Sequence, residues 1–99
     1  MKDATRFEWD PEKDRANRTK HGVSFEEAKE LFESGLDYLE IYDENHSSDE
    51  DRFIAIGPIR RGTVVVAFAE QENVIRVVSA RMASTAEIRR FDAYWRGRK

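Results

Sequence analysis

The most regular hydrophobic pattern of the chain lies between residues 73 and 91. Its first part, residues 74–78, is a run of mainly β-branched residues, which is typical of a largely buried strand. After Ala83 the pattern changes, because Ser84 and Glu87 stand three residues apart, as in a capping box. A helix is therefore predicted over residues 85–96.

Side chains alternate between the two faces of a strand, so this segment predicts two rows. One row comprises Ile75, Val77, Ser79 and Arg81, and the other comprises Arg76, Val78 and Ala80. Arg81 therefore ends an otherwise apolar row. A guanidinium group does not enter a core without a partner, so Arg81 is expected either to pair with a carboxylate or to hold an anion at the rim.

Near the N-terminus, a short strand is predicted over residues 7–9, followed by a helix over residues 11–21. Asp10 and Pro11 suit the N-cap and the first helical position, and Gly22 suits a left-handed cap. This helix has almost no apolar residue, so an apolar stripe cannot hold it in place. Another interaction must therefore hold this helix in place.

Lys13, Asn17 and Lys20 have the i, i+4, i+7 spacing that places them on one face of this helix, with His21 at its end. His21 has a simpler alternative role, as a cation that favours the helix dipole beside Gly22.

The rest of the chain alternates between helix, strand and turn patterns. Ser24 and Glu27 form a second capping box, which predicts an amphipathic helix from residue 25 to about residue 34. Further strands are predicted over residues 38–42, 52–56 and 63–69, with Gly57-Pro58 and Arg60-Arg61-Gly62 in a turn. Short connections between successive strands favour an antiparallel sheet of four to five strands, with two N-terminal helices and one C-terminal helix, in the α+β class.

Composition narrows the type of protein. With 99 residues, the chain is expected to form a single domain over residues 1–99. It has no cysteine, which excludes disulfides and thiolate metal sites, and it has no apolar run long enough to span a bilayer. We therefore predict a cytoplasmic protein without membrane association.

The net charge of −3 hides an uneven distribution of charge. Residues 23–51 contain one Lys or Arg and eleven Asp or Glu, whereas residues 52–99 contain ten Lys or Arg and four Asp or Glu. A local field steers a polyanion more than the total charge does. The C-terminal half is therefore a candidate for binding phosphates.

Four segments together resemble the BrnT family of toxins from bacterial type II toxin-antitoxin systems. They are FEWDPEK, NRTKHGVSFEEA, DRFIAIG and IRVVSARMASTAEIRRF, in the order found in that family. The resemblance implies a RelE-like fold and an endoribonuclease that cleaves mRNA and arrests translation, with no cofactor and no metal. It also implies neutralisation by a BrnA-type antitoxin, which would supply any contact with DNA, and the ribosome is a further candidate partner.

The resemblance also suggests roles for individual residues. Its motifs carry over onto Lys13, Asn17, Lys20, His21, Arg52, Arg81 and Glu87. The chemistry of RNA cleavage then assigns catalysis to Lys20, His21, Arg52 and Arg81. The residues expected to bind RNA are Lys13, Asn17, Arg60, Arg61 and Arg89. Glu87 is expected to support the helix as a capping residue, and Arg81 has pairing with Glu87 as its alternative to phosphate binding.

A second reading of the function rests on departures from the family pattern. Met82 stands where a basic residue is common, Ile88 where arginine is common, and Phe91 where tyrosine is common. Thr63 likewise stands where an arginine often follows the glycine. The alternative is a weakly active or inactive homologue that binds its antitoxin and takes part in repression of its own operon.

Overall fold

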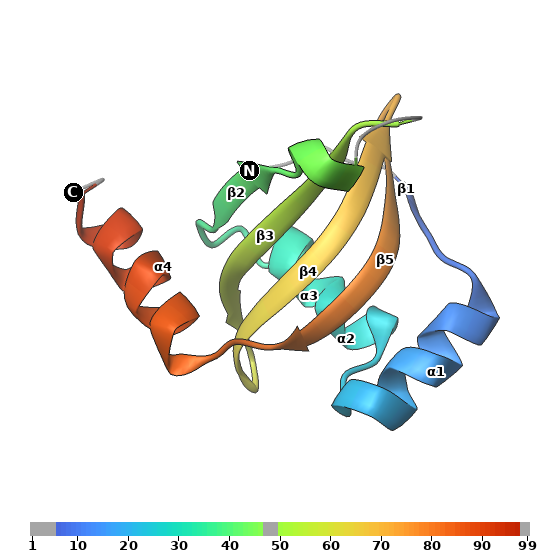
Figure 1. The fold of residues 1–99 in the computed structure, drawn as a ribbon, viewed down its shortest axis with the longest axis horizontal. Helices are drawn as coiled ribbons and strands as arrows, with labels where there is room; N and C mark the ends of the chain where they lie inside the picture. Colours follow the sequence, from blue (N-terminus) through green and yellow to red (C-terminus); the bar gives the residue numbers. More distant parts are fainter. Residues whose placement is uncertain (1–5, 47–49, 98–99) are drawn as a thin grey trace.

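The computed structural model describes residues 6–46 and 50–97, which form a five-stranded sheet with helices (Figure 1). The strands are β1 (Arg6–Glu8), β2 (Leu39–Tyr42), β3 (Arg52–Ile59), β4 (Gly62–Gln71) and β5 (Val74–Met82). The helices are α1 (Pro11–His21), α2 (Phe25–Ala28), α3 (Glu30–Glu33) and α4 (Thr85–Gly97), with a 3-10 helix at Glu44–His46. The predicted α+β class is confirmed.

The strand order in the sheet is β1-β5-β4-β3-β2. β2, β3, β4 and β5 form the predicted antiparallel series, whereas β1 pairs in parallel with β5. The sheet is therefore mixed. Short turns can join only antiparallel neighbours, and β1 is separated from β5 by the helices and the other strands, so its direction did not follow from turn lengths.

The predicted capping residues define the ends of the longer helices. The Asp10 side chain accepts a hydrogen bond from the Glu12 amide at 2.8 Å, and Gly22 ends α1 with a φ of 71°. At the start of α4, the Glu87 amide donates to the Ser84 hydroxyl and the Ser84 amide donates to the Glu87 carboxylate. The helix expected over residues 25–34 is divided at Lys29 into α2 and α3.

β3 continues through Gly57 and Pro58, where a turn was predicted, and ends in a two-residue turn at Arg60 and Arg61. β2 pairs with β3 only as far as Ile56, so Pro58 lies where one side of β3 has no neighbour, and a sheet tolerates proline there. Gly57 is required by close packing, since a Cβ atom at this position would lie 2.6 Å from the Tyr38 Cβ.

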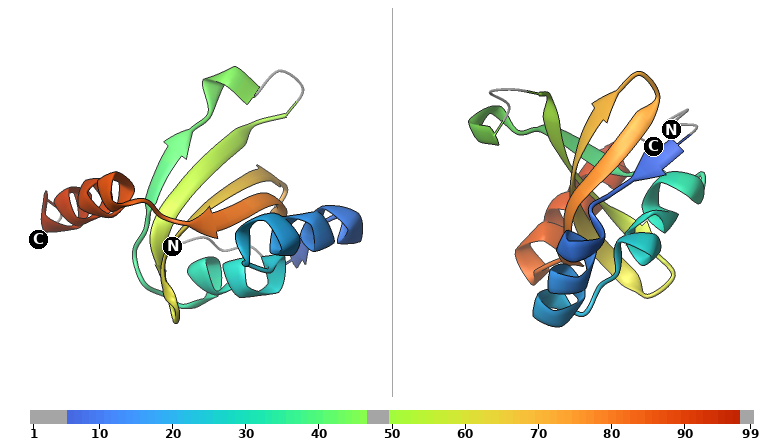
Figure 2. Two further views of the ribbon diagram at one scale, coloured as in Figure 1. Left: turned by 60° about the horizontal axis from the view of Figure 1, so that its bottom comes forward. Right: turned by 90° about the vertical axis from the view of Figure 1, so that its right-hand side faces the viewer.

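The main core lies between one face of the sheet and α2 and α3 (Figure 2). α1 contributes no residue to this core and lies along the β5 edge. Its largest fully buried side chains are Phe25, Phe68, Leu31, Ile75, Val23, Val64, Val66 and Val77. Phe32 contacts the rings of Phe7, Tyr38 and Phe68 at centroid distances of 4.9–5.9 Å. Burial of these apolar side chains is the principal stabilising term of the fold.

β5 contains a bulge that changes the predicted alternation. Ala67 pairs with Ser79, but Phe68 pairs with Val77, so Val78 has no partner in β4. One extra residue shifts every later side chain to the other face. As a result, Ala80 follows Ile75 and Val77 into the main core, and Arg81 lies on the opposite face with Arg76. The prediction that Arg81 shares a face with Ile75 and Val77 is wrong.

α4 packs on the face of the sheet opposite α2 and α3. Phe91, which is 9% exposed, forms a second apolar cluster with Ile56 and Val65. Further side chains packed on this cluster come mainly from β2, β3 and α4, and they are Leu39, Ile41, Ile54, Ala83 and Tyr94. α4 therefore covers the β2–β3 side of this face and leaves the β4–β5 side uncovered within the described residues.

Asn17 explains how a nearly apolar-free α1 is held in place. The Asn17 side-chain amide donates to the carbonyl oxygens of Val23 at 2.8 Å and Ala80 at 2.7 Å, and its oxygen accepts from the Ala80 amide at 3.1 Å. β1 pairs with β5 only as far as Arg76, so Asn17 satisfies backbone groups on an edge of β5 that β1 does not reach. With 7% exposure, Asn17 is a buried anchor between α1 and the sheet.

Candidate nucleic-acid interface

The uncovered part of the sheet displays three arginine side chains, which the register places in two rows. Arg52 and Arg76 both pair with Ala69, one on each side, and Arg81 pairs with Val65. Paired residues share a face of the sheet, so all three arginines lie on the face opposite α2 and α3. We call this surface the arginine face, and it consists of Arg52, Arg76, Arg81, Ala67, Ala69 and Ser79.

The arginine face is open because its central residues are small. Ala67 and Ser79 pair with each other between the two arginine rows, and Ser79 is exposed. The arginine side chains are 31% (Arg52), 41% (Arg76) and 43% (Arg81) exposed. Part of each arginine side chain is therefore accessible from this face.

Arg81 is paired with Glu87 by two parallel hydrogen bonds. Its two terminal nitrogens donate to the two Glu87 carboxylate oxygens at 2.8 and 2.7 Å. These bonds, opposed by partial desolvation and supported by the Ser84 contacts, lower the pKa of Glu87 from 4.5 to about 2. Hydrogen bonding to Glu87 also raises the pKa of Arg81. The Arg81–Glu87 pairing, which the sequence analysis gave as the alternative to phosphate binding, is present. It holds the start of α4 against β5.

The Arg81–Glu87 pair should make stability depend on acid. Because the pKa of Glu87 is lower in the folded chain, its contribution is complete above about pH 4.5 and disappears as the pH falls towards 2. We expect Glu87→Gln to lower the free energy of unfolding at pH 7, with the difference from wild type shrinking towards pH 2. Urea unfolding at several pH values measures this.

Glu44→Gln is the matched control for this experiment, because Glu44 is an exposed carboxylate in the 3-10 helix, outside α4 and the sheet. It should leave the free energy of unfolding almost unchanged at each pH. A pH-independent difference between Glu87→Gln and wild type would contradict the linkage.

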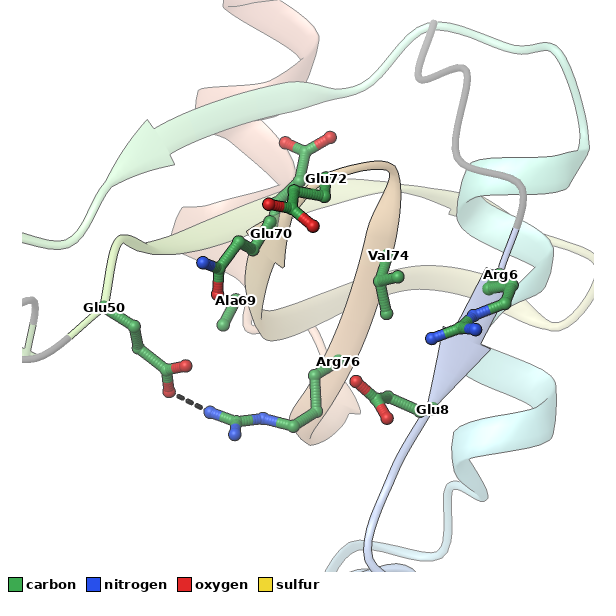
Figure 3. Close-up of a pocket in the computed structure, with 9 residues that line it drawn as sticks. Arg6, Glu8, Glu50, Ala69, Glu70, Glu72, Val74 and Arg76 are labelled. Carbon is green, nitrogen blue, oxygen red and sulfur yellow. Dashed lines mark hydrogen bonds and ion pairs between the residues drawn. The ribbon is translucent and has the colours of Figure 1, made fainter.

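Arg52 and Arg76 share one carboxylate, that of Glu50. The Glu50 Oε1 atom accepts a hydrogen bond from Arg76 (Figure 3). The same oxygen lies 3.5 Å from the Arg52 Nε atom. Glu50 precedes β3, so its side chain reaches across the end of the strand. Neither Arg76 nor Glu50 was predicted as a site residue. Simple alternation of side chains places Arg76 on the face opposite Arg81. The bulge at Val78 shifts the register and brings both arginines to the same face.

The predicted catalytic residues do not form one cluster. The β4 partners of Arg52 and Arg81 are four residues apart, which separates the two arginines by roughly 13 Å along the sheet. Lys20 and His21 lie at the end of α1, and α1 packs against β5 near Ala80. Within residues 6–46 and 50–97, neither forms a hydrogen bond or ion pair with Arg52 or Arg81. Lys20 and His21 thus lie beside β5, toward the end that carries Arg81.

The residues predicted to bind RNA lie on different elements of the fold. Lys13 is exposed on α1, and Arg89 is exposed on α4. The side chain of Asn17 is hydrogen-bonded to backbone groups of Val23 and Ala80, which gives it an anchoring role. Its contact with RNA stays a prediction.

Arg60 and Arg61 form the turn between β3 and β4, at the edge of the main core. Arg61 donates to both Glu27 carboxylate oxygens at 2.7 and 2.9 Å and to the Gly22 carbonyl oxygen at 2.8 Å. The Arg60 amide donates to Glu30 at 3.0 Å. These contacts attach the turn to the α1–α2 connection and to α3, away from the arginine face.

Two further properties concern the described residues only. Residues 6–46 and 50–97 contain no group of three or more His, Asp or Glu side chains placed to hold a metal ion. No helix in the same part of the chain is long and apolar enough to cross a membrane.

The fold and the arginine face define a small α+β protein with a surface suited to a phosphate-bearing ligand. A family model described as "Ribonuclease toxin, BrnT, of type II toxin-antitoxin system" matches residues 9–87, and the chain belongs to this family. The match includes Arg52, Arg76, Arg81 and Glu87, and it confirms the resemblance seen in the sequence motifs. A search of curated proteins gave no match.

Proposed function

We propose that this chain, as a single domain over residues 1–99, is a metal-independent endoribonuclease that cleaves mRNA and arrests translation. The observation that carries the proposal is the arginine face, on which three guanidinium groups surround a floor of small side chains. Arginine matches phosphate oxygens with two parallel hydrogen bonds, and a row of arginines suits successive phosphates of one strand. Membership of a ribonuclease toxin family supports the reaction class.

RNA cleavage without a metal uses the substrate's own 2′-hydroxyl group. The 2′-oxygen attacks the adjacent phosphorus, the bond from phosphorus to the 5′-oxygen breaks, and a 2′,3′-cyclic phosphate and a 5′-hydroxyl result. One proton leaves the 2′-hydroxyl, and one is delivered to the 5′-oxygen. The protein must accept and donate these protons and stabilise the negative charge on the phosphorane.

The positions of the charged residues suggest how these tasks are divided. We assign stabilisation of the phosphorane to Arg81, because it follows Ala80, to which α1 is bonded through Asn17, and α1 ends with His21. Arg81 would use the guanidinium N–H groups that Glu87 does not occupy. His21 is the candidate acid or base, since histidine is the side chain that most often transfers protons in catalysis. Lys20, the neighbour of His21, positions a phosphate. Arg52, roughly 13 Å from Arg81, holds a neighbouring part of the RNA backbone instead of the scissile phosphate.

The toxin-antitoxin assignment implies a partner that neutralises the toxin. We propose a BrnA-type antitoxin that covers the arginine face with acidic or amphipathic residues, so that RNA phosphates are excluded. Contact with DNA would come through the antitoxin, and the protein acts in the cytoplasm, where mRNA and the ribosome are present.

The alternative function, an inactive homologue that only binds its antitoxin, rests on the departures at Met82, Phe91, Ile88 and Thr63. The first two have structural reasons. Met82 packs on the main core and Phe91 belongs to the second apolar cluster, so neither position removes a cation from the arginine face. Ile88 is 38% exposed on α4 and does replace a surface cation. The structure therefore gives the alternative less support than the sequence did.

The proposal is tested by incubating the purified chain with RNA in the presence of EDTA. We expect cleavage to continue, with cyclic phosphate ends, and to stop when the 2′-hydroxyl at the cut position is replaced by hydrogen. His21→Ala should lower the rate by about a hundredfold or more. His46→Ala is the matched control and should cleave as wild type, because His46 lies in the 3-10 helix beside Asp43, remote from α1.

Different outcomes separate the two functions. Cleavage that EDTA abolishes would contradict the metal-independent mechanism. A folded, soluble chain that neither cleaves RNA nor arrests growth when expressed without a partner would favour the antitoxin-binding module.

A further inference from the structure

The Arg52–Arg76 pair already holds an anion, and that anion comes from the protein itself. Glu50 accepts a hydrogen bond from Arg76 (Figure 3). It also lies within ion-pair distance of Arg52. The two arginines are held side by side because both pair with Ala69, which contributes only a methyl group between them. The carboxylate thus lies where two guanidinium groups converge.

A carboxylate and a phosphate make equivalent demands on such a pair. Both present oxygen atoms that accept two hydrogen bonds from a guanidinium fork, and both carry negative charge. They cannot share the same nitrogens, and their like charges repel each other when they are close. A phosphate that reaches Arg52 and Arg76 must therefore displace Glu50.

The surroundings of Glu50 allow this displacement at little structural cost. Glu50 lies outside β3, which begins at Arg52, so movement of its side chain breaks no hydrogen bond of the sheet. The same region borders a cavity of about 430 Å³, which offers space for a displaced side chain. Two arginines, Arg6 and Arg76, and four glutamates, Glu8, Glu50, Glu70 and Glu72, line this cavity.

We propose that Glu50 occupies, in the free protein, the position of an RNA phosphate between Arg52 and Arg76, and that RNA binds there by displacing it. This inference rests on the proposed ribonuclease function and extends it, because it adds Arg76 to the RNA-binding surface and makes Glu50 an internal competitor. Glu50 thereby lowers the affinity for RNA and favours ligands whose phosphate can replace a carboxylate.

The test measures binding without cleavage. A fluorescent single-stranded RNA with 2′-O-methyl groups at every position is titrated with wild type, Glu50→Gln and Glu44→Gln by anisotropy at fixed salt. Glu50→Gln keeps the side-chain shape but removes the competing charge, and we expect binding about two- to fivefold tighter than wild type, as for loss of one exposed ion pair. Glu44→Gln removes the same charge from the same acidic segment without touching either arginine, and should change affinity less.

A double variant shows whether the gain comes from the arginine pair. In an Arg76→Gln background, the additional change Glu50→Gln should give a smaller gain than it gives in wild type, because the competition at Arg76 has already been removed. Circular dichroism and thermal unfolding of each variant establish that the fold is retained.

The possible results distinguish this inference from the proposed function. An equal increase in RNA affinity for Glu50→Gln and Glu44→Gln would mean that the effect comes only from the change in net charge. This result would overturn the role of Glu50 as a competitor. Weaker binding by Glu50→Gln would mean that Glu50 positions the arginines for RNA, which also overturns it. In both cases, the cleavage assay above can still support the ribonuclease. Failure of every variant to bind the RNA would reject the arginine face as its binding site.

Discussion

Arg81→Ala is expected to lower the rate of RNA cleavage by roughly a hundredfold or more, the usual cost of removing one group that stabilises charge in the transition state. Arg81 is the arginine of the exposed face nearest to the end of β5, beside which α1 ends with His21. The measurement is the initial rate of cleavage of a labelled RNA by the purified variant. Growth after induced expression without a partner provides the cellular counterpart, in which the variant should no longer arrest growth.

The Arg81–Glu87 pair supplies a control for this prediction. Arg81→Ala also removes a contact that holds the start of α4, so a loss of activity has two possible causes. Glu87→Gln weakens the same contact and keeps the guanidinium group, and we expect it to retain cleavage within a few-fold of wild type. Equal losses in the two variants would show that Arg81 acts only by positioning α4.

The second large effect concerns stability. Asn17→Ala removes three hydrogen bonds and leaves backbone groups of Val23 and Ala80 without their partner. An unsatisfied buried polar group costs about 1–3 kcal/mol, and the losses at one site are not additive, so we expect a decrease of about 2–4 kcal/mol in the free energy of unfolding. For a domain of this size, this lowers Tm by roughly 10–20 °C.

Thr19→Ala is the matched control, since Thr19 is exposed on the same helix. It should change the free energy of unfolding by less than about 0.5 kcal/mol. If Asn17→Ala unfolds as wild type but binds RNA more weakly, Asn17 contacts RNA as the sequence suggested, and its anchoring role is wrong.

Local sequence determined much of this fold. Asp10, Pro11 and Gly22 mark the limits of α1, and Ser84 with Glu87 starts α4, because capping depends on hydrogen bonds between residues close in the chain. The long apolar run over residues 63–69 likewise predicted a strand, and β4 covers Gly62–Gln71. Such features need no knowledge of the tertiary structure.

The site was less accessible to prediction because it depends on register. Strict alternation of side chains along β5 would place Arg76 and Arg81 on opposite faces. The residue types around Val78 do not predict the bulge that changes this. Glu50 forms ion pairs with Arg52 and Arg76 next to the start of β3. Its segment is acidic, and the sequence pattern there is typical of a solvent-exposed loop.

Asn17 shows the same limit for a helix. Its spacing groups it with Lys13 and Lys20, yet it points to the edge of β5. The helical period gives relative positions around an axis, and only the packed structure decides which of them meets the sheet. A polar residue among lysines can therefore be the buried one.

The parallel pairing of β1 with β5 has a consequence for the timing of folding. Arg6 pairs with Val74 and Asn17 binds Ala80, so the N-terminal strand and helix find their partners only when most of the chain is available. Contacts this distant in sequence form late and slowly. During synthesis on the ribosome, β1 and α1 emerge long before β5. We therefore expect the nascent chain to remain harmless to the cell that makes it until nearly the whole polypeptide has been translated.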